Sequence, residues 1–522
     1  MRMSNRNQRH SVAFTRRDFL KVSLAAAALT ACSRIPGTST IAGNSATTGQ
    51  LPTTSAPTAA PAGATATLQA TATTKQPGLA WLAANRLMFG PRAGDLQHID
   101  DIGVDAFIEE QLAVNAPDSD RLQSKLAPLT SLSLNTAALV QDSQTIKTNV
   151  LMQLQQSTLL RAIYGARQLH EVMVDFWTNH FNIYFFKNED RFLKTIDDRE
   201  VIRPHTLGKF IDILDASAHS PAMLVFLDNQ TNRKGNPNEN YGRELMELHT
   251  ISVDGGYTQD DVVAVARAFT GWSVRGYNKN NPNANAGEFV FIPGQHDNDA
   301  KTILGQTLPA GGGEQDGMKV LDLLAHNPHT ATFISAKLAR RFIADQPPAN
   351  VVKAGASAFT SSGGDIKATL GAILHSEDFK NSFGQKIKRP LDLVASSLRA
   401  LDADTDGGGL LIGALALMGQ PLFQWQFPNG FPDTNGAWSG AGVMLTRWNL
   451  GIALGANAIK NTHIDFASLI QGHSGDVIDA LSMRLFGSPL PADVRNTLKP
   501  FTSDTATLTA LLLASPLFQI KG

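Results

Sequence analysis

The chain has 522 residues, a net charge of -1 at pH 7 and one cysteine, and 43% of its residues are hydrophobic. This hydrophobic content is enough to form a large buried core, so the chain as a whole is not intrinsically disordered. The balanced charge excludes a protein built around nonspecific nucleic-acid binding, which requires a clear basic excess. A single cysteine excludes a disulfide framework, a cysteine-ligated zinc site and an iron–sulfur cluster held by cysteines alone.

The first 31 residues indicate an export signal. Residues 15–21 match, at every defined position, the twin-arginine pattern Ser/Thr-Arg-Arg-x-Phe-Leu-Lys, in which Arg16 and Arg17 are the paired arginines. The apolar run that follows, 22–31, is too short to span a bilayer, which takes about 20 apolar residues. We therefore expect residues 1–31 to be a signal peptide and the twin-arginine translocase to be a partner.

The signal ends at a site that resembles a bacterial lipobox. Leu29, Thr30 and Ala31 precede Cys32, which is the only cysteine of the chain. This arrangement predicts that Cys32 is acylated and becomes the N-terminus of a membrane-anchored protein of the cell envelope. The alternative is ordinary signal cleavage nearby, after one of the alanines.

Residues 33–78 have the composition of a flexible tether. Of these 46 residues, 36 are Ser, Thr, Ala, Pro or Gly, and Arg34 and Lys75 are the only charged ones. Such a segment has almost nothing to bury and cannot offset the entropy of ordering. We expect a disordered linker with a reach of roughly 35–40 Å between Cys32 and the folded body.

From residue 79 onward the apolar residues recur at helical spacing. We predict one mainly α body over 79–522, a large multi-helix domain with strand below about 10%. The predicted helices cover 151–164, 167–180, a segment opened by Pro204, 258–269, 316–326, 329–344, 365–375, 387–402, 442–456 and 504–515. The best strand signal is 289–292, before Pro293 and Gly294, which predicts one arm of a small β-hairpin.

The body lacks the common catalytic motifs but contains three polar segments. The P-loop, the dinucleotide-binding glycine pattern, the serine nucleophile elbow and the zinc motif with two histidines are all missing from the sequence. The three polar segments are 175–181, 236–250 and 296–301. In the second, Asn238 is a candidate helix cap, and Glu244 and Glu247 follow one turn apart on one helix face.

We hypothesise that these segments form one site. His180, Glu244, Glu247 and His296 would then ligate one divalent transition metal, such as zinc, iron or manganese. Glu244 and Glu247 would serve as acid and base, and Arg243 would orient a carboxylate or contact an anionic substrate group. The alternative is purely structural: Arg243 would form i,i+4 ion pairs on its own helix, and the histidines would be satisfied in the core.

An aromatic-rich loop occupies part of the C-terminal third. It contains Phe423, Trp425, Phe427, Phe431 and Trp438, interleaved with proline and glycine. Exposed rings of this kind stack on sugars, whereas buried ones fill the core under a long loop, and the sequence leaves both alternatives open.

Several of these segments together resemble the domain of unknown function 1800 (DUF1800). The similarity covers about 79–520 and is carried by 85–91, 177–181, 238–245, 256–258 with 270–272, 296–297 with 301–302, and 388–390. The resemblance implies a bacterial export class, because members often carry twin-arginine signals and are frequently encoded beside exported proteins similar to alkaline phosphatases and sulfatases. It implies no catalytic residues, because the family has no assigned activity.

Two functions follow as expectations. The first is a metal-dependent hydrolase or oxidoreductase of the cell envelope. The second is a noncatalytic scaffold or maturation partner of a co-exported protein similar to phosphatases or sulfatases. Twin-arginine export carries folded cargo and is compatible with both.

Overall fold

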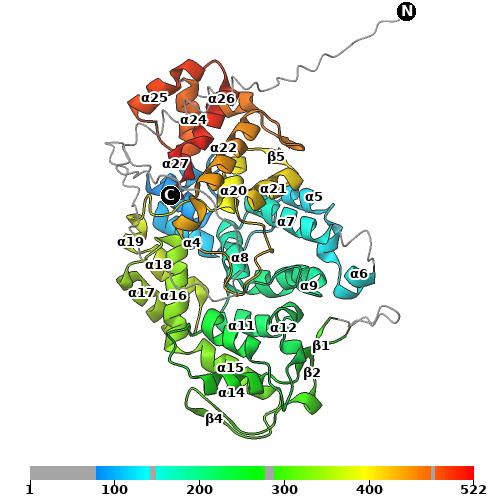
Figure 1. Ribbon diagram of the computed structural model, residues 1–522. Helices are drawn as coiled ribbons and strands as arrows, with labels where there is room; N and C mark the ends of the chain where they lie inside the picture. Colours follow the sequence, from blue (N-terminus) through cyan, green and yellow to red (C-terminus); the bar gives the residue numbers. More distant parts are fainter. Residues whose placement is uncertain (1–77, 114, 142–148, 277–286, 472–475) are drawn as a thin grey trace, which may run out of the picture.

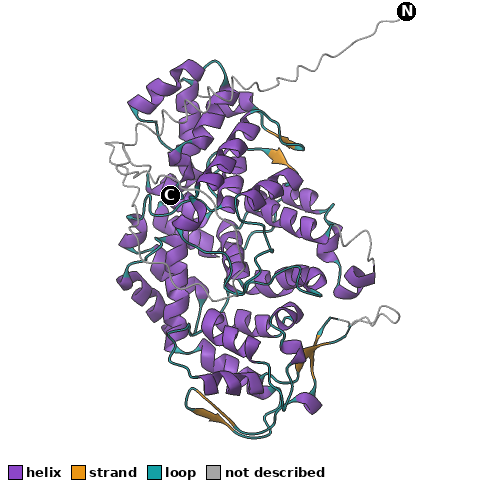
Figure 2. Ribbon diagram, viewed as in Figure 1, coloured by secondary structure: helices purple, strands orange, loops and turns teal. Residues whose placement is uncertain are grey.

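The computed structural model describes residues 78–113, 115–141, 149–276, 287–471 and 476–522. The predicted signal peptide, Cys32 and the tether up to residue 77 lie outside these residues. The body is 62% helical, and its strands form only small two-stranded sheets (Figure 2). The predicted mainly α fold with a small hairpin is therefore confirmed.

The first part of the body is entirely helical, and its last two helices lie where the apolar periodicity predicts them. Both end with a basic residue in the last turn, Arg161 and His180, as the helix dipole favours. The elements are α2 (Leu79–Leu87), α3 (Asp95–Ile102), α4 (Val104–Ala113), α5 (Asp120–Leu126), the 3-10 turn η1 (Thr130–Ser133), α6 (Thr136–Gln141), α7 (Val150–Tyr164) and α8 (Gln168–His180).

The next part contains two π-helical stretches, which no sequence pattern predicts. The elements are α9 (Asp190–Ile196), the π-helical η2 (Asp197–Ile202), α10 (Arg203–His205), α11 (Phe210–Ala218), α12 (Pro221–Phe226), η3 (Asn229–Thr231), α13 (Glu239–Glu244), the π-helical η4 (Leu245–His249) and α14 (Gln259–Ala268). Local capping signals are confirmed here: Asn238 accepts from the backbone N–H of Asn240, and Thr258 forms a capping box with Asp261.

The prediction that Pro204 opens a helix is wrong. Pro204 lies near the end of a continuous helical stretch that runs through α9, η2 and α10, and the helix that holds Phe210 begins at Phe210 itself. The wider π turn before Pro204 lets the helix continue into a residue that has no N–H to donate.

Six short strands form three antiparallel pairs in the described residues. β1 (Trp272–Val274) pairs with β2 (Phe289–Phe291), with Trp272 opposite Phe291, so the predicted strand is one arm of a pair. β3 (Lys301–Ile303) and β4 (Gln306–Leu308) are joined by Leu304 and Gly305, both at positive φ as a tight two-residue hairpin turn requires. β5 (Asp404–Thr405) pairs with β6 (Thr462–His463).

Among the described residues, none of the helices combines the length and the apolar character needed to span a membrane. The remaining helices complete the body. They are η5 (Pro293–Gln295), α15 (Gln315–Ala325), α16 (Pro328–Phe342), α17 (Ala349–Ser361), α18 (Ile366–Leu374), α19 (Glu377–Lys380), α20 (Pro390–Ala400), α21 (Gly409–Leu417), η6 (Asn435–Trp438), α22 (Ala441–Gly455), α23 (Phe466–Ile470), α24 (Val477–Phe486), α25 (Ala492–Leu498), η7 (Lys499–Phe501), α26 (Thr505–Ala514) and α27 (Pro516–Gln519).

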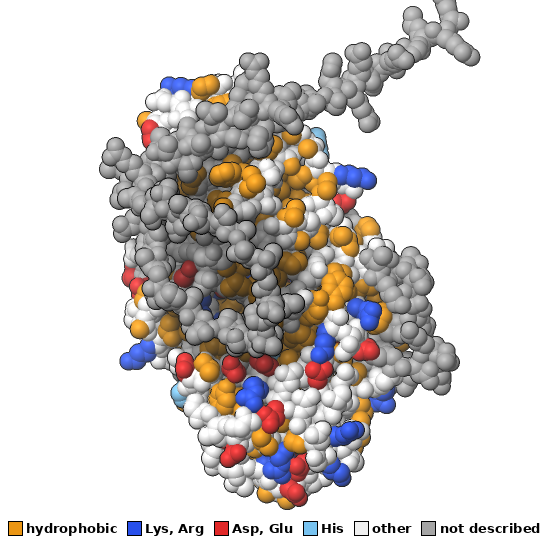
Figure 3. Space-filling view, in the orientation of Figure 1, with side chains coloured by type: hydrophobic (Ala, Val, Ile, Leu, Met, Phe, Trp, Pro, Cys, Tyr) orange, Lys and Arg blue, Asp and Glu red, His pale blue; other side chains and the backbone are white. Residues whose placement is uncertain are grey.

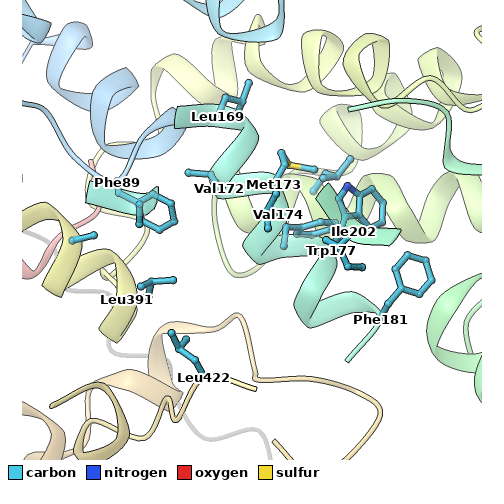
Figure 4. Packing of buried hydrophobic residues seen from close by; sticks show 14 of the residues in the cluster. Phe89, Leu169, Val172, Met173, Val174, Trp177, Phe181, Ile202, Leu391 and Leu422 are labelled. Carbon is cyan, nitrogen blue, oxygen red and sulfur yellow. The ribbon is translucent and has the colours of Figure 1, made fainter. Parts of the chain in front are cut away.

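Helix α8 lies in the middle of the molecule (Figure 1). Leu169, Val172, Met173 and Trp177 recur on one face of it at helical spacing and are fully buried (Figure 4). Each such side chain contributes about 1.5–3 kcal/mol through removal from water. The indole N–H of Trp177 also donates to the carbonyl of Thr206 at 2.9 Å, so the C-terminal end of α8 is held firmly.

The long connection between α21 and α22 passes this end of α8 and is attached to it. The Asn182 amide donates to the carbonyls of Trp425 and Phe427, and the Phe185 N–H donates to the carbonyl of Phe423. Asn179 both donates to the carbonyl of Phe431 and accepts from its N–H. The aromatic-rich loop predicted from the sequence is thereby fixed beside α8.

Candidate anion-binding pocket

The acidic pair predicted as the catalytic centre lies on the helix formed by α13 and η4. Burial and, after it, the neighbouring Glu247 raise the pKa of Glu244. Arg243 does not reach an anionic site: it pairs with Glu239 at 2.9 Å, one turn back on its own helix, and also donates to Gln259. Arg243 thus forms an i,i+4 ion pair on its own helix, as expected if its role is purely structural.

His296 lies in a separate buried network. Its Nδ1 donates to the carbonyl of Thr270 at 2.8 Å, and its Nε2 lies 3.3 Å from a carboxylate oxygen of Asp316. Lys301 donates to the same oxygen at 2.8 Å. These contacts of His296, Thr270, Asp316 and Lys301 hold the segment that follows β2 in place. His296 has no contact with Glu244 or Glu247.

His180 occupies a third place, at the end of α8. Its Nε2 donates to the carbonyl of His249 at 3.1 Å, and its Nδ1 accepts from Lys337 Nζ at 2.9 Å. Burial, and after it the charge of Lys337, lowers the pKa of His180 well below the ordinary value, so the imidazole is neutral. His180 therefore meets the last residue of η4 through a backbone carbonyl and not through Glu244 or Glu247.

The predicted metal site is thus not formed in the part of the chain that the structure describes. His180, His296 and the acidic pair lie in three environments, and no three His, Cys, Asp or Glu side chains of the described residues are placed to hold a metal ion. The physical reason is that three of the four predicted ligands are oriented by another partner: Lys337 for His180, Thr270 and Asp316 for His296, and Tyr257 for Glu247.

A pocket of about 430 Å³ adjoins His180. It lies between the end of α8, the last turns of α16 and the aromatic-rich loop. Four rings line it, those of Phe176, Phe333, Trp425 and Phe431. Its size falls within the range of about 300–1,000 Å³ that is typical of sites for small ligands.

The pocket lining is strongly cationic. Lys337, Arg340, Arg341 and Arg389 line it, against the single carboxylate of Asp433. Lys337, half-buried, has no carboxylate within 4 Å among the described residues and donates to the neutral His180 instead. Burial lowers the pKa of Lys337 to about 8, although Asp433 works in the opposite direction.

The two buried arginines share the carboxylate of Asp175 behind the pocket, and each also lies within 4 Å of a carboxylate oxygen of Asp392. Asp175 accepts from Arg341 at 2.9 Å and also pairs closely with Arg389. The Nε atoms of both arginines are buried and form no hydrogen bond among the described residues, although Arg389 Nε lies 3.6 Å from a carboxylate oxygen of Asp392.

The cationic excess continues beneath the pocket. Burial lowers the pKa of Lys388 and of Lys521 to about 7, and Asp392 only partly opposes this effect in each case. The Asp392 carboxylate itself accepts from Lys521 at 2.8 Å. Burial is the main cause of both shifts, so these lowered pKa values show the desolvation of two amines. At Arg389, by contrast, the carboxylates of Asp175 and Asp392 outweigh burial and raise the pKa.

The loop wall of the pocket is held by a close backbone approach. Gly430 has φ +70, and a Cβ there would lie 2.2 Å from the carbonyl oxygen of Asn179. Only glycine fits this position without displacing α8 or the loop. A smaller cavity of about 30 Å³ is also lined by Asn179 and Phe431 and has room for about one water molecule.

Sequence reasoning found part of this pocket. The segment 175–181 and the aromatic-rich loop were both singled out, and Lys388, Arg389 and Pro390 contribute to the family resemblance. Lys337, Arg340 and Arg341 were missed, because basic residues in the last turns of a helix are expected for the helix dipole alone. A usable signal was present: these three cations recur at i, i+3 and i+4 on one helix.

The fold and pocket together define a mainly helical protein with a cationic site beside a central helix. Residues 82–520 match the family model described as protein of unknown function (DUF1800), so the chain belongs to this family. No curated protein and no solved structure is detectably similar to the chain.

Proposed function

We propose that this chain is an exported, membrane-tethered protein that binds an organic anion in the pocket between α8, α16 and the aromatic-rich loop. The observation that carries the proposal is the imbalance of the lining, with four cations against one carboxylate. Guanidinium groups bind phosphate, sulfate and carboxylate through pairs of N–H donors, and three of the four cations that line the pocket are arginines.

The ring side chains specify the rest of the ligand. Trp425 and Phe431 lie 4.9 Å apart between centroids on the loop side, and Phe333 faces the pocket from α16. Aromatic walls favour a flat or ring-shaped apolar portion. The ligand class is therefore a phosphate or sulfate ester, or a carboxylate, attached to a ring.

Calorimetric titration with phenyl phosphate and with inorganic phosphate tests the pocket. We expect the full chain to bind phenyl phosphate more tightly. Lys337→Met should weaken both anions about 10-fold, the equivalent of about 1.4 kcal/mol, because one charge-assisted contact is lost. Trp425→Ala should weaken phenyl phosphate alone.

Lys353→Met is the matched control, because Lys353 is exposed on α17 and does not line the pocket. It should bind both anions as the unaltered chain does. The proposal fails if neither anion binds at millimolar concentration, or if Lys353→Met weakens binding as much as Lys337→Met does.

The same pocket bears on the two functions expected from the sequence. A metal-dependent hydrolase or oxidoreductase would need a ligand cluster other than the predicted one. A noncatalytic partner of a co-exported phosphatase-like or sulfatase-like protein would need only to hold the anionic ester, and the pocket supports this candidate. We expect phenyl phosphate to bind without turnover; release of phenol by the purified protein would make the chain an enzyme instead.

Export and anchoring form the other part of the proposal, which rests on the sequence. Replacing Arg16 and Arg17 together by lysine should leave the precursor in the cytoplasm. Cys32→Ala should prevent acylation and release the protein from the membrane fraction. Normal processing and membrane retention of Cys32→Ala would contradict lipidation.

A further inference from the structure

The stretch from residue 407 to residue 446 is almost free of charge. Asp433 is the only charged residue among these 40, and the next one, Arg447, is buried at 1% exposure. The stretch contains α21, the aromatic-rich loop and the first turns of α22. It therefore presents a surface of a different kind from the rest of the body, where Lys, Arg, Asp and Glu are scattered (Figure 3).

Four large apolar side chains of this stretch point into solvent. Leu410 is 60% exposed, Leu417 76%, Phe427 62% and Leu445 50%. We call these four side chains the apolar face. In Figure 3 hydrophobic side chains gather over the region where Figure 1 places α20 to α22.

Helix α21 is apolar on all sides. Its buried side, with Leu411, Ile412 and Leu415, packs on the body, but its outer side carries Leu410 and Leu417 instead of polar residues. A helix that is hydrophobic all round is normally covered on all sides by protein or lipid.

A row of rings joins the apolar face to the pocket. Phe427 lies 6.1 Å from Trp425 between ring centroids, and Trp425 lies 4.9 Å from Phe431. Phe431 lies 6.2 Å from Trp438, which packs close to Gly419 just after α21. The exposed Phe427 of the apolar face thus lies beside Trp425, which lines the cationic pocket.

We propose that this surface docks on a lipid bilayer and that the pocket then receives an anionic lipid headgroup. Exposed leucine and phenylalanine side chains enter the boundary between headgroups and acyl chains, and the lipid phosphates lie just above that boundary. A cationic pocket at the rim of such a face is complementary to those phosphates. This inference rests on the proposed function, since the pocket must bind anions for the headgroup to be held.

Sedimentation with vesicles tests the docking. The protein is the full chain with Cys32→Ala, so that no acyl chain contributes to binding. Every variant contains residues 1–77, so any binding by that segment is the same in all of them. The vesicles are phosphatidylcholine alone or phosphatidylcholine with about one-third phosphatidylinositol, an anionic lipid whose phosphate is attached to a ring, as in the proposed ligand class.

We expect preferential binding to the anionic vesicles. Leu417→Ser combined with Leu445→Ser should weaken it at least 10-fold, because both side chains lie on the apolar face and neither lines the pocket. Val253→Ser combined with Met483→Ser removes two exposed apolar side chains elsewhere and should leave binding unchanged. Lys337→Met should remove the preference for the anionic vesicles.

The two proposals fail in different ways. The docking inference is wrong if phenyl phosphate binds the pocket but no vesicle binds the protein. It is also wrong if the variant with Leu417→Ser and Leu445→Ser binds vesicles as well as the control variant does. In both cases the anion pocket stands. If vesicles bind without any effect of Lys337→Met, the pocket does not receive the headgroup. A dimer in solution that the Leu417 and Leu445 replacements dissociate would assign the face to a second copy and overturn the inference.

Discussion

At the scale of single residues, the pocket is governed by which partner each charged side chain finds. His180 was predicted as a metal ligand, and the structure places it against Lys337, so its Nδ1 lone pair is already used. Asp175 belongs to the polar segment 175–181, and the sequence assigned it no role. In the structure its carboxylate pairs with both Arg341 and Arg389.

Anion binding should depend on pH through Lys337. The pKa of this amine is lowered to about 8 in the free protein, and a bound anion favours the charged form. Well below pH 8 this amine is already charged and adds no pH dependence of its own; above pH 8 it must take up a proton for the anion to bind, so affinity falls with rising pH. Calorimetric titrations with phenyl phosphate between pH 6.5 and 9.5 should show this fall in affinity. In Lys337→Met the fall above pH 8 should be absent.

Asp175→Asn should strongly destabilise the body. The replacement removes the closest carboxylate of both Arg341 and Arg389 and leaves them only longer contacts with other carboxylates, and breaking such buried pairs costs about 3–5 kcal/mol. Asp479→Asn is the comparison, because Asp479 pairs with Arg495 at the surface and should cost under about 1 kcal/mol. Urea unfolding measures both; equal losses would mean that Asp175 contributes no more than a surface pair.

At the scale of elements, close helix contacts depend on small residues that the sequence pattern does not mark. Gly451 and Gly455 lie four residues apart on α22 and face Ala510 on α26. At Gly455 a Cβ would lie 2.6 Å from the carbonyl oxygen of Ala506 and 2.9 Å from the Ala510 side chain. Because both obstacles belong to a rigid helix, α22 and α26 would have to separate.

Gly455→Ala should therefore cost about 1–3 kcal/mol of unfolding free energy by overpacking. Gly442→Ala on the same helix should be neutral or stabilising by up to about 1 kcal/mol, since a Cβ there meets nothing within 4 Å and alanine favours the helix. Chemical denaturation of the two variants gives the comparison. A destabilised Gly442→Ala together with an unaffected Gly455→Ala would refute the close packing of α22 on α26.

At the scale of the whole molecule, one buried arginine joins distant parts of the chain. Arg86 on α2 donates to the carbonyls of Phe342 and Ile343 at the end of α16 and to that of Ser382 after α19. It also reaches the carbonyls of Lys521 and Gly522. The first helix, the middle of the body and residues 521–522 thus meet at one guanidinium group.

Arg86→Met should lower the unfolding free energy by about 3 kcal/mol or more, because several buried carbonyls lose their donor at about 1–3 kcal/mol each. Arg86→Lys should recover only part of the loss, since an ammonium cannot reproduce the planar set of donors. Thermal and urea unfolding report the effect. Unchanged stability of Arg86→Met would show that these carbonyls find other donors and that Arg86 does not join the parts.

Helical periodicity and local caps determined most of the fold before any tertiary information. The helices over 150–164 and 168–180, the cap at Asn238 and the Thr258 capping box were predictable because each depends on residues within one or two turns. The ion pair of Glu239 and Arg243 is of the same local kind. The π turns were not predictable, since they depend on how neighbouring helices pack.

The candidate site was decided by tertiary structure. Lys337 lies 157 residues from His180, Arg341 lies 166 from Asp175, and Arg389 lies 214 from Asp175. A sequence shows which residue types are present and which face of a helix they share, so it suggested a site around His180 but assigned it the wrong partners. Residues so far apart in the sequence become partners only because α8, α16 and the aromatic-rich loop pack together. That packing determines which charged side chains are buried together and which one has no counter-charge.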